Sequence, residues 1–85
     1  MQIEYSRKFI KEFKKCPIKI RKSFKERLGV FIKNKYDPIL NNHCLSGKLK
    51  DYKSININAN WRAIFEEDEE RIYFVIIGTH SQLYS

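Results

Sequence analysis

Cysteines and long apolar runs are scarce in this 85-residue sequence. Its two cysteines, Cys16 and Cys44, are too few for a disulfide scaffold and lack the paired spacing of a zinc site. The longest uncharged apolar run, residues 72–78, is far shorter than the roughly 20 residues of a membrane span. No signal-peptide segment and no glycine-rich phosphate or dinucleotide motif is present. We therefore expect a cytoplasmic protein with no membrane partner, no cofactor and no metal.

The length and composition favour one folded domain over residues 1–85. A chain of this size has room for a single hydrophobic core. Hydrophobic residues make up 42% of the sequence and aromatic residues 14%, which is too apolar for a disordered chain. The core is therefore predicted to be compact and rich in aromatic side chains.

Positive charge is concentrated in the first half of the chain. Lysine and arginine number 17 against 10 acidic residues, a net charge of +7. Residues 1–50 hold 14 of the basic side chains and only 4 of the acidic ones. A basic face favours a polyanionic partner, most often nucleic acid. The alternative is a solvated, lysine-rich helix surface.

The hydrophobic pattern predicts an α+β fold with the order β-α-α-β-β-β. Two amphipathic helices are expected, the first over 7–15 with Ser6 as its cap, and the second opened by Pro17. Strands are expected at residues 2–5, 53–58, 61–66 and 71–77, with a long loop over 34–46. These elements predict a helical hairpin packed on one face of an antiparallel sheet, with a concave, polar opposite face. The expected core consists of Phe9, Phe13, Ile20, Phe24, Leu28 and Phe31 against Ile55, Ile57, Phe65, Val75 and Ile77.

Two histidines lie in loops next to expected strands. His43 precedes the sheet, and His80 follows the last strand. Histidine exchanges protons near neutral pH, so the pair could supply the base and the acid that cleave a phosphodiester. On position alone, each is more simply read as an exposed loop histidine without a catalytic role.

Arg62 and Tyr84 each allow a functional and a structural interpretation. Arg62 lies inside an expected strand, where its guanidinium could bind a phosphate or form a salt bridge with Glu66 or Glu70. Tyr84 could stack on a base or bond a phosphate, or it could close the core as an aromatic lid.

Three segments together resemble the RelE/ParE toxin superfamily, and within it the YafQ-like branch. They are the His-x-Leu-x-Gly segment at residues 43–47, the Asn-Trp-Arg segment at 60–62, and the Gly-Thr-His-Ser-x-Leu-Tyr ending at 78–84. The resemblance extends over residues 3–84. It implies a toxin of a type II toxin–antitoxin system, a ribosome-dependent endoribonuclease that cuts mRNA and is neutralised by a cognate antitoxin.

The resemblance also assigns site residues. His80 corresponds to the catalytic histidine, His43 to the second histidine, and Tyr84 to the closing aromatic position. Asn60 stands where aspartate is common, Asn56 replaces a frequent histidine, and Ile76 replaces a frequent arginine. Arg62 matches an arginine of the RelE branch. The resemblance therefore implies that Arg62, in place of the missing arginine at position 76, clamps the phosphate.

The resulting hypothesis is a metal-independent mRNA interferase. His80 is expected to act as the acid, His43 as the base, and Arg62 as the group that stabilises charge. Expected RNA-binding residues are Lys48, Lys50, Lys53, Asn56, Asn60 and Tyr84, and the expected partners are an acidic antitoxin, the ribosome and mRNA. Two alternatives remain: a ParE-like inhibitor of DNA gyrase that cuts nothing, and a toxin-fold protein with weakened catalysis.

Overall fold

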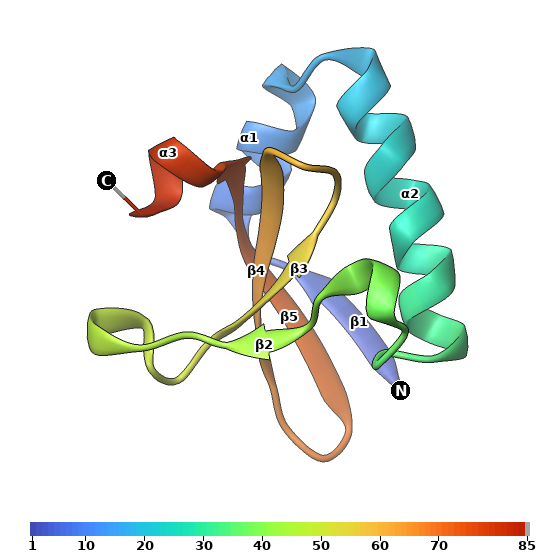
Figure 1. Ribbon diagram of the computed structural model, residues 1–85, viewed down its shortest axis with the longest axis vertical. Coiled ribbons are helices and arrows are strands. Elements are labelled where there is room, and N and C mark those ends of the chain that lie inside the picture. The colour runs from blue at the N-terminus through green and yellow to red at the C-terminus, as the bar shows by residue number, and fades with distance from the viewer. Residues whose placement is uncertain (85) are drawn as a thin grey trace.

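A computed structural model describes residues 1–84, in which helices pack on a five-stranded mixed sheet (Figure 1). The strands are β1 (Gln2–Tyr5), β2 (His43–Cys44), β3 (Lys53–Asn56), β4 (Trp61–Glu67) and β5 (Arg71–Thr79). The helices are α1 (Arg7–Lys15), α2 (Ile18–Lys33) and the short α3 (His80–Tyr84). The strand order across the sheet is β1-β5-β4-β3-β2. None of the helices in residues 1–84 is long and apolar enough to span a bilayer.

The α+β class and the order of the main elements are confirmed. Ser6 caps α1 as predicted, because its Oγ accepts a hydrogen bond from the Phe9 amide at 2.9 Å. Pro17 is the N-cap of α2, just before its first helical residue. The predicted loop over 34–46 contains two elements that the sequence did not indicate, a 3-10 turn at Pro38–Leu40 and the two-residue strand β2.

The prediction of an antiparallel sheet is wrong at one edge. Strands β2 to β5 pair antiparallel with their neighbours, but β1 pairs parallel with β5, with Gln2 opposite Arg71 and Tyr5 opposite Phe74. The connection from β1 passes through both helices and the other strands before the chain returns beside it as β5. Turn residues between strands predict the pairing of strands that follow one another in the sequence. They do not predict which strand pairs with β1, because β1 and β5 are far apart in the chain.

A cluster of aromatic rings joins α1 and α2 to one face of the sheet. Phe24 on α2 lies 5.4 Å from both Phe9 on α1 and Phe74 on β5, measured between ring centroids. Phe31 meets Phe65 edge-on at 5.3 Å further along α2. Such offset and edge-to-face pairs add specific geometry to the burial of large apolar surfaces. The two helices therefore cover one face, as predicted.

The expected core is confirmed except at Val75. A bulge at Ile64/Phe65 inserts one extra residue on β5, so that Phe65 pairs with Phe74 rather than with Val75. Phe74 is consequently fully buried against the helices, whereas Val75 is only half-buried. The other predicted core residues are buried or packed against the core.

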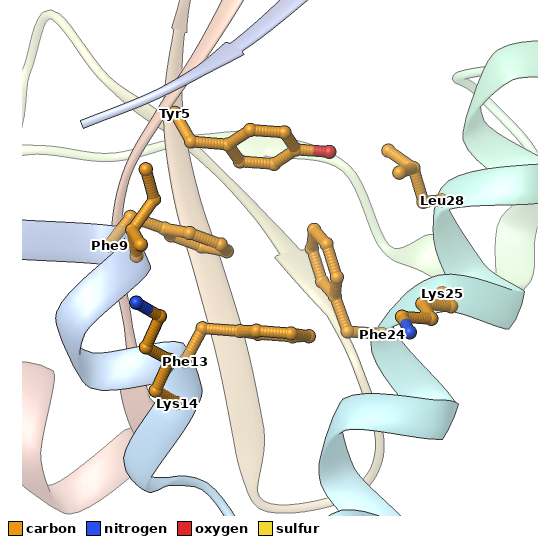
Figure 2. A pocket seen from close by; sticks show the side chains of 8 residues that line it. Tyr5, Phe9, Phe13, Lys14, Phe24, Lys25 and Leu28 are labelled. Atoms are coloured by element: carbon orange, nitrogen blue, oxygen red, sulfur yellow. The ribbon is translucent and has the colours of Figure 1, made fainter. Parts of the chain in front are cut away.

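A groove with apolar walls remains open between α1 and α2 (Figure 2). Tyr5, Phe9, Phe13 and Phe24 line it, and one lysine from each helix, Lys14 and Lys25, stands at its rim. Burial raises the pKa of the Tyr5 hydroxyl above its ordinary value. We call this feature the aromatic groove.

Candidate active site

A polar hollow lies on the sheet face opposite α1 and α2. In Figure 1, α2 lies to the right of the strands and α3 to the left. The hollow has a volume of about 320 Å³, and its lining comprises Asn41, His43, Leu45, Arg62, His80 and Tyr84. The fold thus brings together both histidines, the strand-borne arginine and the C-terminal tyrosine that the sequence singled out. The rest of this face is less polar than predicted, since Ile64, Val75 and Ile76 line a neighbouring hollow.

His43 is held in one orientation by the loop that precedes it. Its Nδ1 lies 2.7 Å from the backbone carbonyl oxygen of Asn41. A carbonyl oxygen only accepts hydrogen bonds, so Nδ1 must carry the proton. In the neutral ring, the lone pair is therefore on Nε2. The Asn41 backbone, which adopts the left-handed conformation with φ of 46°, thereby prepares His43 to accept a proton.

His80 opens α3 and lies against the ring of Tyr84. The two ring centroids are 4.7 Å apart, and the ring planes are inclined by 57°. The backbone amide of His80 donates to the carbonyl oxygen of Asn60 at 2.7 Å, which ties the start of α3 to the β3–β4 turn. The imidazole itself is exposed to solvent. His80 is therefore held through its backbone and its ring face, and its imidazole is open to solvent in the lining of the hollow.

Arg62 bonds the turn beside it rather than a glutamate. Its guanidinium donates to the carbonyl oxygens of Asn58, Trp61 and Ala59 at 2.9, 3.1 and 3.3 Å. The salt bridge to Glu66 or Glu70 considered from the sequence is not formed in residues 1–84. A guanidinium carries five N–H donors, so two remain for an anion in the hollow.

The other predicted RNA-binding residues are dispersed. Asn60 is exposed on the turn that holds Arg62, and Lys48 and Lys50 are exposed on the loop between β2 and β3. Asn56 is half-buried and pairs with Arg62 in the strand register, and its Oδ1 finds no donor among the described residues.

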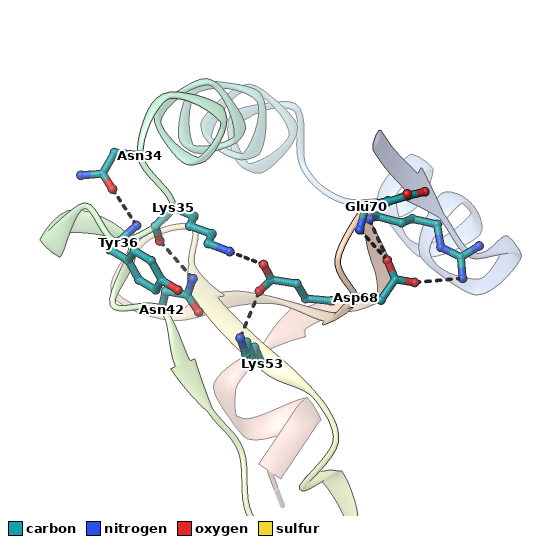
Figure 3. A network of polar contacts seen from close by, with 9 residues as sticks. Asn34, Lys35, Tyr36, Asn42, Lys53, Asp68 and Glu70 are labelled. Atoms are coloured by element: carbon teal, nitrogen blue, oxygen red, sulfur yellow. Dashed lines mark hydrogen bonds and ion pairs between the residues drawn. The ribbon is translucent and has the colours of Figure 1, made fainter. Parts of the chain in front are cut away.

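Lys53 lies apart from the hollow. Its Nζ is 3.0 Å from the Glu67 carboxylate, which also binds Lys35 (Figure 3). Burial works to raise the pKa of Glu67, but hydrogen bonds from Lys35 and Lys53 outweigh it and hold the pKa below its ordinary value. This network joins the segment that follows α2 to the sheet.

Sequence reasoning assigned no role to three residues of this site. Asn41 and Leu45 line the hollow, and Ser54 beneath it accepts a hydrogen bond from the Tyr84 hydroxyl at 3.2 Å. The Asn41-Asn42 pair before His43 could have indicated the turn that orients this histidine, because asparagine tolerates the left-handed conformation. Tyr84 is half-buried, and this bond joins its hydroxyl to the sheet at the edge of the hollow.

The arrangement suits proton transfer at a phosphate. The imidazole of His43 can accept a proton, and that of His80 can donate one. The guanidinium of Arg62 on β4 attracts negative charge. In the described part of the chain, no three or more His, Cys, Asp or Glu side chains gather into a possible metal site.

Comparison with solved structures gives the class of the fold. Escherichia coli YafQ, from strain BL21(DE3), matches with a TM-score of 0.84 and 23% identity over 99% of this chain and 98% of that one. E. coli YafQ in its complex with DinJ matches at 0.81, with 24% identity over 99% and 97% of the two chains. The YoeB/ParE toxin from Agrobacterium tumefaciens matches at 0.76, with 12% identity over 94% and 99%. The fold is that of the YafQ and RelE-like toxins.

The family follows from the sequence of the whole chain. Residues 1–85 match the family described as bacterial toxin of type II toxin–antitoxin system, YafQ. The chain belongs to this family. No curated protein sequence matches it significantly.

Proposed function

We propose that this toxin is a ribosome-dependent endoribonuclease that cuts mRNA without a metal ion. The observation that carries the proposal is that His43, Arg62 and His80, from three separate elements, line one hollow. Membership of a toxin family is consistent with it. The same hollow has no evident use in a protein that only inhibits DNA gyrase, which is the rival function.

The proposed reaction is an internal transesterification. Nε2 of His43 takes the proton of the ribose 2′-hydroxyl, whose oxygen attacks the adjacent phosphorus. The bond from phosphorus to the 5′-oxygen breaks, and His80 donates a proton to that leaving oxygen. The products are a 2′,3′-cyclic phosphate and a 5′-hydroxyl, and no external nucleophile is consumed. Arg62 stabilises the extra charge on the phosphate.

The exposed lysines support a role for the ribosome in positioning the message. Lys48 and Lys50 are exposed on the β2–β3 loop. In Figure 1 this loop extends to the left of the strands, as α3 does. Contacts of lysine with phosphates position a nucleic acid without reading its sequence. We propose that these contacts hold ribosomal or messenger RNA so that one phosphodiester enters the hollow.

The second proposed partner is a cognate acidic antitoxin. The aromatic groove is apolar and carries Lys14 and Lys25 at its rim, so an amphipathic acidic segment complements it. Reversing these charges together, Lys14→Glu with Lys25→Glu, should slow association with the antitoxin by roughly ten-fold. The matched control reverses Lys19 and Lys33, two exposed lysines at the ends of α2. Equal slowing by both pairs would contradict docking in the groove.

Cleavage on ribosomes separates the proposed function from its rivals. Purified toxin is incubated with ribosomes translating a reporter mRNA, with the same mRNA free in solution, and with gyrase in a supercoiling assay. New mRNA ends only in the translating sample support the proposal. Gyrase inhibition without mRNA cuts supports the ParE-like alternative, and no effect in any sample supports a weakened toxin fold.

A further inference from the structure

Ser54 is a polar residue in an apolar layer. It is fully buried, and it is the one polar side chain in residues 1–84 with that degree of burial. In the strand register it lies between His43 on β2 and Ile64 on β4, so its side chain shares the face of the hollow. A buried hydroxyl is costly unless it is hydrogen-bonded. The partner of Ser54 is the hydroxyl of Tyr84, 30 positions away, at 3.2 Å.

This bond holds the far end of α3. The helix has five residues, too few for a stable helix on its own. Its first residue is tied to the Asn60 carbonyl, and Thr79 and Gln82 exchange local hydrogen bonds at its start. Of the described contacts at its last residue, the bond from Tyr84 to Ser54 is the one that reaches the sheet.

The anchored tyrosine in turn supports the imidazole of His80. The rings of Tyr84 and His80 lie 4.7 Å apart, one helical turn from each other on α3. If the Tyr84 ring rotates or α3 frays, the His80 ring loses the surface against which it rests. An error of about 1 Å in the position of a reacting group is enough to slow a reaction substantially.

We propose that Ser54 is a positioning residue, which sets the orientation of His80 through Tyr84. The inference rests on the proposed function, in which His80 donates the proton to the leaving oxygen. Ser54 is fully buried, so it has no surface with which to contact the RNA directly. Ser54 acts by holding the last residue of α3 in one position through its bond with Tyr84.

Three variants test this chain of contacts: Ser54→Ala, Tyr84→Phe and the double variant. Tyr73→Phe is the matched control, because it removes a hydroxyl from another half-buried tyrosine. One measurement is the maximal single-turnover cleavage rate at saturating ribosomes, with the half-saturating concentration. The other is the ¹H–¹³C NMR signal of the His80 imidazole in the free toxin across pH, which requires no cleavage.

Each single variant should lower the maximal rate by roughly three- to ten-fold, the worth of one hydrogen bond. Ser54→Ala should leave the half-saturating concentration unchanged, because Ser54 is buried and is not in the lining of the hollow. The double variant should be no slower than the singles, because both remove the same bond. The His80 signals should move alike in all three variants and stay in place in Tyr73→Phe.

Two results would overturn the inference. One is a double variant whose loss is the product of the single losses. The other is a Ser54→Ala protein in which the His80 signals and the maximal rate equal those of the wild type. If the wild-type toxin cuts no mRNA, the proposed function fails, and the His80 signals alone then decide the role of Ser54.

Discussion

Replacing His80 by alanine removes the proposed acid without disturbing the fold. General acid catalysis by a positioned side chain contributes roughly 10²- to 10⁴-fold to a rate, so His80→Ala should slow cleavage by this factor. The imidazole is exposed and contacts the ring of Tyr84, so its loss should change the free energy of unfolding by less than about 1 kcal/mol. Single-turnover cleavage of ribosome-bound mRNA gives the first quantity, and urea unfolding the second.

His80→Gln separates proton donation from hydrogen bonding. Glutamine can bond the leaving oxygen but does not titrate, so its rate should stay close to that of His80→Ala. Ribosome binding should remain near the wild-type value in both variants, because the phosphate attraction is assigned to Arg62 and the lysines. A His80→Ala toxin that cuts mRNA at the wild-type rate would refute the assignment.

Three further predictions concern the base, the RNA contacts and the ion-pair network. His43→Gln should remove the acidic limb of the pH–rate profile of cleavage; retention of that limb would exclude His43 as the base. Replacing Lys48 and Lys50 by alanine should reduce the slope of log affinity for ribosomes against log salt by about 2, measured by pelleting at several salt concentrations; an unchanged slope would exclude these contacts. The lowered pKa of Glu67 stabilises the fold above pH 4.5, its ordinary value, and this contribution disappears as the pH falls through the folded pKa. Glu67→Gln should therefore lower the free energy of unfolding by roughly 1–2 kcal/mol at pH 7 and by less at pH 3; an equal loss at both would contradict this sign.

Local patterns predicted most of the fold because most of its elements are defined by nearby residues. Alternation along 53–58 and 61–66 depends on neighbours, and the Ser6 cap depends on the Phe9 amide. The parallel partner of β1 and the bulge at Val75 depend on contacts far apart in the sequence. Elements as short as β2 and α3 carry too few residues for a periodic signal.

The candidate site was predictable in its residue types but not in its geometry. Two histidines 37 positions apart give no distance, and only the paths of β2 and α3 on the open sheet face bring them to one hollow. Lys53 was predicted to bind RNA, but in the folded chain it forms an ion pair with Glu67, away from the hollow. The Asn41 carbonyl and the Ser54 hydroxyl act through tertiary contacts, which residue identity does not reveal.

The chemistry of the cut ends tests the central claim most directly. The mRNA fragments from toxin-treated translating ribosomes are analysed by mass spectrometry and by ligation that depends on the terminal groups. Attack by the 2′-hydroxyl with His43 as base and His80 as acid predicts 2′,3′-cyclic phosphates and 5′-hydroxyls, both lost in His80→Ala. Fragments that instead carry 3′-hydroxyls and 5′-phosphates would show attack by water and contradict the mechanism.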